Sequence, residues 1–168
     1  MKYADSKEYY NKEYYDEGNT AEKIQAIKNF RRLFRGKKLR PNIVLDVGCG
    51  RGMLVKLLRE KGVESYGLDF SDFAGELIPK WFIKQDADKP YPFDNKEVDV
   101  VFSSAFFEHL PEGEIDVVYN EMRRVGKKIY AVIGYKSQIV NGVQTHLTIK
   151  PPKWWADRLP EVEQLGIR

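Results

Sequence analysis

The chain holds one cysteine and no long apolar run, and each shortage excludes a class of protein. One cysteine, Cys49, among 168 residues rules out an internal disulfide framework and fits a reducing compartment, so we expect a cytoplasmic protein. The apolar runs fall well short of the about 20 residues that cross a bilayer, and the polar N-terminus has no signal-peptide core. We therefore expect no membrane association, and the 42% hydrophobic content is typical of a globular domain.

Apolar runs of strand length alternate along the chain with helical patterns. Several strand-like runs are almost continuously apolar, as in strands buried on both faces of a parallel sheet. One helical pattern ends at Gly62, a C-cap signal. This alternation predicts an α/β protein with a doubly wound, mostly parallel sheet flanked by helices. The expected strands are Ile43–Val47, Glu64–Leu68, Trp81–Lys84, Val98–Ser103 and Lys128–Ile133, and the expected helices are Tyr9–Asp16, Thr20–Arg35, Met53–Lys61, Glu112–Arg124 and Lys153–Leu159.

A glycine-rich turn, DVGCGRGM, follows the first expected strand. It lacks the Gly-Lys-Ser/Thr ending of a P-loop, and Met53 stands where the fingerprint G-x-G-x-x-G needs its third glycine. Asp46 would repel a pyrophosphate and attract a cation. Gly48 and Gly50 let the backbone approach a ligand that a Cβ would obstruct. A ligand with an α-ammonium group and a sulfonium therefore suits this turn better than a diphosphate does.

Polar residues also follow the other expected strands. Asp69 ends the second strand, where doubly wound folds place an acid on ribose hydroxyls. Asp86 follows the third strand, at a place from which it could accept a hydrogen bond from an adenine amine. The fourth strand runs into Ser103 and then into Glu108 and His109, at the crevice beside the first strand. These positions predict a site for an adenosine-containing ligand.

The segments VLDVGCGRG, YGLDFS, QDADKPYPFDNKEVDVVFSSAFFEHL and EMRRVGKKIYAVIG resemble the successive motifs of class I S-adenosylmethionine-dependent methyltransferases, in order over about residues 43–135. The resemblance implies a Rossmann-like fold and S-adenosylmethionine as the cofactor. Its methionine end, ribose and adenine would be held in turn by residues along the chain, under a tyrosine-rich lid helix. The implied cofactor-binding residues are Asp46, Gly48, Cys49, Gly50, Asp69, Phe70, Asp86, Ala87 and Ser103, with Tyr10, Tyr14 or Tyr15 from the lid.

We expect one domain, residues 1–168, with three parts. Residues 1–40 would form N-terminal helices and the lid, residues 41–135 the cofactor-binding core, and residues 136–168 the substrate side. The link at residues 71–80 is short, so its helix can hold barely two turns.

The sheet of the family usually ends in an antiparallel strand pair, which this sequence lacks or alters. Asn141-Gly142 between apolar runs predicts a hairpin in this region. The fifth strand would otherwise leave an open edge. We expect either Gln138–Ile149 or a second chain to pair with that edge, so a homodimer is a possible partner arrangement.

The expected activity is methyl transfer from S-adenosylmethionine to an oxygen or nitrogen of a small molecule. A hydroxyl acceptor would benefit from a general base, for which His109 and His146 are the only histidines available. Ser103-Ser104-Ala105-Phe106 stands where adenine-amine methyltransferases carry Asn/Asp-Pro-Pro-Tyr/Phe. The basic run at residues 28–40 favours an alternative, an RNA or protein acceptor. A non-catalytic adenosyl-binding module is a further alternative, and no metal site is predicted.

Overall fold

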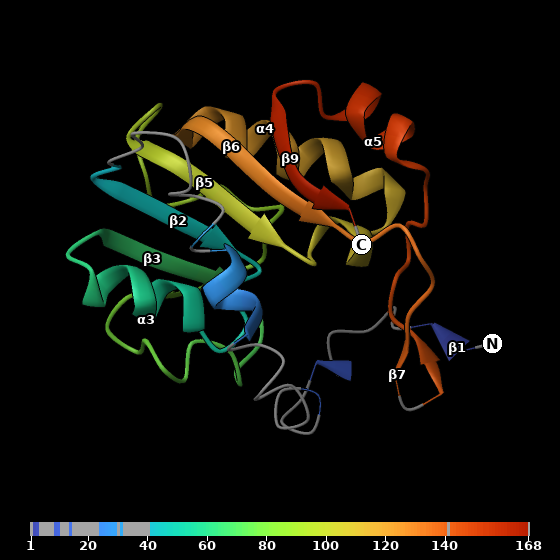
Figure 1. The fold of residues 1–168 in the computed structure, drawn as a ribbon, viewed down its shortest axis with the longest axis horizontal. Coiled ribbons are helices and arrows are strands. Elements are labelled where there is room, and N and C mark those ends of the chain that lie inside the picture. Colours follow the sequence, from blue (N-terminus) through green and yellow to red (C-terminus); the bar gives the residue numbers. More distant parts are fainter. Residues whose placement is uncertain are drawn as a thin grey trace.

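The core of the protein is one six-stranded sheet in which every strand runs parallel to its neighbours (Figure 1). The computed structural model describes residues 2–3, 9–10, 14, 24–29, 31, 41–140 and 142–167. Across the sheet the strands are β4 (Phe82–Lys84), β3 (Glu64–Asp69), β2 (Ile43–Val47), β5 (Val98–Ser104), β6 (Gly126–Ile133) and β9 (Val162–Ile167). The order reverses at β2, which confirms the predicted doubly wound α/β fold. Folds of this kind bind ligands at the carboxyl ends of the strands beside the reversal.

Helices cover both faces of the sheet (Figure 1). On β6, Ile129 and Ala131 join the core beneath α4 (Ile115–Val125) and α5 (Pro152–Arg158), whereas Tyr130 packs with α3 (Met53–Glu60) on the opposite face. The helical residues 24–29 lie on the α3 face, where Ala26 is buried in the same cluster. Two short 3-10 turns, η2 (Phe107–His109) and η3 (Glu112–Glu114), precede α4.

The end of α3 shows how the sequence sets one boundary. Gly62 has a φ of +78°, and its N–H donates to the Arg59 carbonyl at 2.9 Å while the Val63 N–H donates to the Leu58 carbonyl at 3.0 Å. This pair of bonds satisfies carbonyls that would otherwise lack partners at a helix end, as in the Schellman motif. The predicted C-cap at Gly62 is confirmed.

The structure differs from expectation at two links. Residues 71–80 contain turns and no helix, so the short helix expected there is wrong. The open edge of β6 is covered by β9, which lies parallel to it, and not by Gln138–Ile149. The usual last strand pair is therefore altered, as predicted, although the segment expected to replace it was wrong. The homodimer stays a prediction that no longer depends on a bare β6 edge.

The residues after β6 instead form a small separate sheet. β7 (Ile139–Val140) and β8 (Val143–Gln144) make the predicted antiparallel hairpin, with Gly142 at a φ of +75°. β1 (Lys2–Tyr3) pairs in parallel with β8 and so brings the start of the chain to the β7–β8 hairpin (Figure 1). No helix among the described residues is both long and apolar enough to cross a membrane.

Asp99 joins the start of β2 to β5 and β6. Its Oδ2 accepts the N–H groups of Asn42 at 2.6 Å and Ile43 at 3.2 Å, and its Oδ1 accepts from Lys127 Nζ at 2.6 Å. The Lys127 ammonium and the two backbone donors hold the pKa of the Asp99 carboxyl below its usual value, against partial desolvation. Ionised Asp99 therefore contributes stability above about pH 4, and this contribution is lost as the pH falls through the lower folded-state pKa.

We expect Asp99→Ala to lower the free energy of unfolding at pH 7 by about 1–2 kcal/mol, because three donors lose a charged acceptor near the surface. Below pH 4 the difference from the wild type should shrink. Urea unfolding followed at pH 7 and pH 3 measures both values. Asp94→Ala, at an exposed position, is the matched control and should change little. A difference that grows at acid pH would contradict this account.

Candidate functional site

The glycine-rich turn lies at the carboxyl end of β2, between β3 and the segment after β5. Gly48 and Gly50 have φ values of +71° and +53°, which glycine adopts without the steric cost of a Cβ. A Cβ on Gly48 would lie 2.4 Å from Phe106 Cδ2. The N–H groups of Gly48 and Cys49 both donate to the Leu68 carbonyl, at 2.8 and 3.1 Å. Contacts on both sides therefore fix the path of the turn.

Asp69, the last residue of β3, lies directly against this turn. Its Oδ2 accepts the Gly50 N–H at 3.1 Å, and its Oδ1 accepts the Ser71 N–H at 3.1 Å. The residue is 8% exposed, so the carboxylate is held inside the site by backbone donors. Each carboxylate oxygen has two acceptor positions, so accepting one backbone N–H does not exhaust either oxygen.

Two further predicted residues lie at the ends of the central strands. Asp46 is buried in β2, one residue before Val47 at the carboxyl end of the strand. Ser103 lies opposite Val47 on β5 and is 1% exposed. Among the described residues, Ser103 Oγ has no hydrogen-bond partner. A buried hydroxyl of this kind can accommodate a further polar partner.

The predicted adenine contacts lie on the β4 side of Asp69. The Gln85 N–H donates to the Asp69 carbonyl at 2.9 Å. Asp86 and Ala87 directly follow Gln85, so this bond brings them near Asp69. Asp86, Ala87 and Phe70 are all partly buried. The structure therefore brings these three positions to the same edge of the sheet as the glycine turn.

Tyrosines from the N-terminal part of the chain reach this edge. The Tyr10 ring meets the Phe70 ring edge-on at 5.5 Å between centroids, and the Tyr14 ring at 4.9 Å. The Tyr10 carbonyl accepts from Ser71 Oγ at 2.7 Å. Burial raises the pKa of the Tyr10 phenol, and Tyr14 beside it adds to the shift, so Tyr10 stays neutral. Tyr10 thus lies beside Phe70 and Tyr14 beside Tyr10, while Tyr15 is outside the described residues.

The two histidines of the chain come together beyond Tyr10. The rings of His109 and His146 are 4.9 Å apart and nearly perpendicular. His109 Nδ1 lies 2.9 Å from the Thr145 carbonyl and 3.1 Å from the Tyr10 hydroxyl, and His146 Nδ1 lies 2.5 Å from the Lys136 carbonyl. Burial, with the neighbouring His146, lowers the pKa of His109 to about 4, against the bond to Thr145. Burial also lowers the pKa of His146.

Glu108, which the sequence places at the crevice without a chemical role of its own, completes this group. Its side chain is 1% exposed, and its Oε1 accepts the Gly134 N–H at 2.7 Å. Its carbonyl accepts the N–H groups of Leu147 and Thr148 at 2.8 and 3.1 Å, which fixes the segment that carries His146. The sequence pairs Glu108 with His109 but gives no sign that a residue so far along the chain as His146 joins them.

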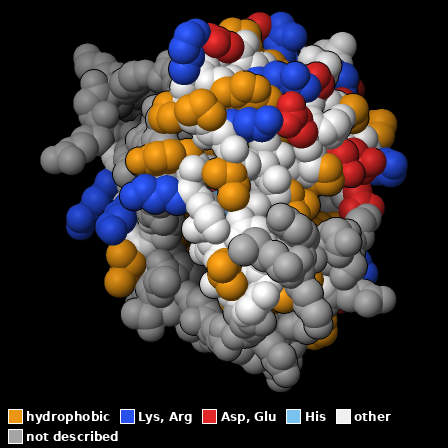
Figure 2. All heavy atoms as spheres, turned by 90° about the vertical axis from the view of Figure 1, so that its right-hand side faces the viewer, with side chains coloured by type: hydrophobic (Ala, Val, Ile, Leu, Met, Phe, Trp, Pro, Cys, Tyr) orange, Lys and Arg blue, Asp and Glu red, His pale blue; other side chains and the backbone are white. Residues whose placement is uncertain are grey.

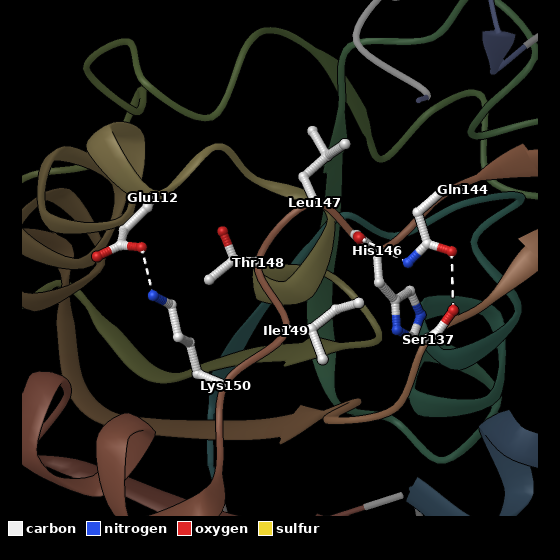
Figure 3. Close-up of a pocket in the computed structure, with 8 residues that line it drawn as sticks. All are labelled: Glu112, Ser137, Gln144, His146, Leu147, Thr148, Ile149 and Lys150. Atoms are coloured by element: carbon white, nitrogen blue, oxygen red, sulfur yellow. Dashed lines mark hydrogen bonds and ion pairs between the residues drawn. The ribbon is translucent and has the colours of Figure 1, made fainter. Parts of the chain in front are cut away.

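A cavity of about 390 Å³ opens beside His146 (Figure 3). Its wall holds both polar and apolar side chains, and two interactions join residues of the wall, between Lys150 and Glu112 at 2.8 Å and between Ser137 and Gln144 at 2.9 Å. Figure 3 shows the His146 ring close to Ser137 on one side of this space. The cavity is lined by Glu112, Ser137, Gln144, His146, Leu147, Thr148, Ile149 and Lys150.

Comparison with known proteins gives the family. Residues 45–129 match the model of the methyltransferase domain family, so the chain belongs to that family. It is 31% identical over 96 residues to an uncharacterized methyltransferase of Geobacillus sp. (strain WCH70), over 52% of this chain and 45% of the relative. The fold is similar to that of a SAM-dependent methyltransferase from Archaeoglobus fulgidus, with a TM-score of 0.59, 26% identity, and 73% and 57% of the two chains covered.

A protein from Pyrococcus horikoshii OT3 is similar at a TM-score of 0.55 and 29% identity, with 76% of this chain and 66% of that chain covered. The chain spans about half the length of its curated relative. Family membership implies S-adenosylmethionine as the cofactor. The residues at the turn fit this cofactor. A buried acid, Asp46, suits a ligand with two cationic groups, and the buried Ser103 hydroxyl can bind a polar group of the ligand.

Proposed function

We propose that the chain transfers a methyl group from S-adenosylmethionine to an oxygen or nitrogen of a small-molecule acceptor. One observation carries the proposal. The glycine turn after Asp46 packs against Phe106, and the Tyr10 hydroxyl contacts His109. These two residues connect the turn to the group of two neutral histidines and one glutamate. One side is suited to the cofactor and the other to an acceptor.

The cofactor supplies an activated methyl group on a cationic sulfur, and the protein binds and orients the cofactor. In this proposal Asp46 and the turn Gly48–Gly50, with Cys49, hold the methionine end, and Asp69 accepts from the ribose hydroxyls. Because backbone N–H groups hold the Asp69 carboxylate in place, little further ordering is needed on binding. The proposed adenine contacts are Phe70, Asp86 and Ala87, and Ser103 lies under the methionine portion.

Residues 41–135 would then be the cofactor-binding core, with acceptor residues on either side of it. Tyr10 and Tyr14, from residues 1–40, exclude water and position the acceptor. Residues 136–168 bring His146 and the cavity. Neutral His146 or His109 can accept a proton from a hydroxyl acceptor, whereas a neutral amine needs little assistance.

The size of the cavity and the surface charge favour a small acceptor over RNA. A volume of about 390 Å³ is within the range of small-molecule sites. On the face in Figure 2, basic and acidic side chains are interspersed over the upper and right parts, whereas a small basic group lies at the left. Lys150, Lys153 and Arg158 form ion pairs with nearby acids. Lys28 and Arg31, from the basic run, are exposed and remain the candidates for an RNA contact.

The test is methyl transfer from labelled S-adenosylmethionine into cell extract fractionated into metabolites, RNA and protein. We expect label in the metabolite fraction. Tyr14→Ala should lower the initial rate by about tenfold to a hundredfold, because a misplaced acceptor loses the alignment that an in-line displacement requires. The double variant Lys28→Glu/Arg31→Glu should stay within about threefold of the wild type, because a small acceptor needs no extended electrostatic grip.

Two outcomes would contradict the proposal in different ways. Label in the RNA fraction that disappears with Lys28→Glu/Arg31→Glu would favour the alternative acceptor. Binding of S-adenosylhomocysteine without transfer of label to any fraction would indicate a non-catalytic adenosyl-binding module.

A further inference from the structure

We propose that Glu108, His109 and His146 bind a divalent transition-metal ion, with Zn²⁺ as the best-fitting ion, on the acceptor side of the cofactor. One potential ligand atom from each residue lies within 4.8 Å of the others. Two ligands that are each about 2.1 Å from a tetrahedral ion are about 3.4 Å apart. Side-chain movements of about 1 Å would therefore bring the three atoms onto one ion.

Hydrogen bonds to backbone carbonyls determine which nitrogen of each histidine is available to bind an ion. A backbone carbonyl only accepts hydrogen bonds, so the Nδ1 atoms beside Thr145 and Lys136 must carry the protons. Each neutral ring then keeps its lone pair on Nε2. Histidine ligands of metal ions usually donate their other N–H to a carbonyl or carboxylate in this way, which fixes the tautomer and the ring orientation.

The backbone holds the three side chains in a fixed relation. Glu108 Oε1 accepts from the Gly134 N–H, and the Glu108 carbonyl accepts from Leu147, the residue after His146. A Cβ on Gly134 would lie 2.7 Å from both Glu108 Oε1 and His146 Cε1. The absence of a side chain at Gly134 is thus what allows the carboxylate and the ring to reach the same place.

The ligand types favour Zn²⁺ over Mg²⁺ or Ca²⁺. Two imidazole nitrogens and one carboxylate oxygen suit Zn²⁺ and its neighbours in the first row, whereas Mg²⁺ and Ca²⁺ prefer oxygen ligands. Three protein ligands leave at least one coordination position open. Because His146 also lines the cavity, an acceptor with an oxygen donor could occupy that position. This last step rests on the proposed function, whereas metal binding itself does not.

The direct test is titration of the tag-free chain, stripped with a chelator, with Zn²⁺ in a calorimeter and with Co²⁺ followed by absorption. We expect one ion per chain and a Co²⁺ spectrum typical of nitrogen and oxygen ligands. The chain has only two histidines, so no surface histidine can imitate the site. Absence of stoichiometric binding to the wild type would overturn the proposal.

Conservative variants test the ligand assignment without removing the structural contacts. In His146→Asn the amide can replace Nδ1 at the Lys136 carbonyl but offers nothing in place of Nε2. In Glu108→Gln the side-chain oxygen can still accept from Gly134. Each should weaken Zn²⁺ binding at least about a hundredfold, since even outer-shell losses cost about 10- to 100-fold. Glu114→Gln, at an exposed position, is the matched control and should bind as the wild type does.

Circular dichroism and binding of S-adenosylhomocysteine separate this inference from the proposed function. Folded Glu108→Gln and His146→Asn that bind S-adenosylhomocysteine normally and lose Zn²⁺ would support the metal site. Variants that retain Zn²⁺ affinity, or an equal loss in Glu114→Gln, would overturn it. Metal binding by a wild-type chain that does not bind S-adenosylhomocysteine would contradict the proposed function and leave the metal site standing.

Discussion

Asp69→Ala is expected to weaken binding of S-adenosylhomocysteine by about ten- to a hundredfold. Hydrogen bonds to a charged group contribute about 1.5–3 kcal/mol, and 1.4 kcal/mol corresponds to a factor of ten in affinity. Asp69 has two tasks in the proposed site, since it would accept from the ribose and already accepts the Gly50 and Ser71 N–H groups. Its loss should therefore remove ligand contacts and also release the glycine turn.

Calorimetric titration with the wild type, Asp69→Asn and Asp69→Ala separates these tasks. Asparagine keeps one acceptor oxygen for a backbone N–H but has no charge, so its affinity should lie between the other two. Asp72→Ala, three residues away on the exposed surface, is the control and should stay within about threefold of the wild type. Equal affinity of the wild type and Asp69→Ala would exclude Asp69 as the ribose ligand.

Local patterns in the sequence predict the core of the fold well. The strand Ile43–Val47 has the predicted bounds, and the others differ by one or two residues. The central strands β2 and β5 are recognisable in the sequence because most of their residues are buried and apolar, as in strands covered on both faces. The helix end at Gly62 could be predicted because few residues other than glycine adopt a φ of +78°.

Associations between distant segments could not be predicted in the same way. The expected segment Gln138–Ile149 has as good a strand pattern as Val162–Ile167, yet the latter pairs with β6. The choice depends on α5, which buries Trp155 against Phe107 with ring centroids 6.4 Å apart and so directs the chain back to the sheet. Tertiary packing decided between two segments of similar local propensity.

The candidate site was only partly predictable for the same reason. Asp46, Asp69 and Ser103 lie at the carboxyl ends of β2, β3 and β5, and Asp86 follows β4, so the fold alone places them at one edge. Glu108, His109 and His146 meet only because the segment after the β7–β8 hairpin returns to the Glu108 carbonyl. No spacing in the sequence encodes that return.

Gly48→Ala is expected to lower the free energy of unfolding by about 2–5 kcal/mol. A non-glycine residue at a φ of +71° costs about 1–2 kcal/mol. A Cβ 2.4 Å from Phe106 Cδ2 and 3.1 Å from Phe106 Cβ must displace the segment after β5, and overpacking of this kind costs about 1–3 kcal/mol more. Because the same turn would carry the methionine end of the cofactor, affinity for S-adenosylhomocysteine should fall as well.

Gly62→Ala isolates the steric part of this effect. Gly62 has a similar φ of +78°, but a Cβ there meets nothing within 4 Å. Denaturant unfolding should therefore show a loss of about 1–2 kcal/mol for Gly62→Ala, and Gly48→Ala should exceed it. In Phe106→Ala the added cost of Gly48→Ala should shrink, because the ring that it meets has been removed. Equal costs at Gly48 and Gly62 would show that the turn has room beside Phe106, and the close approach would then not explain the glycine.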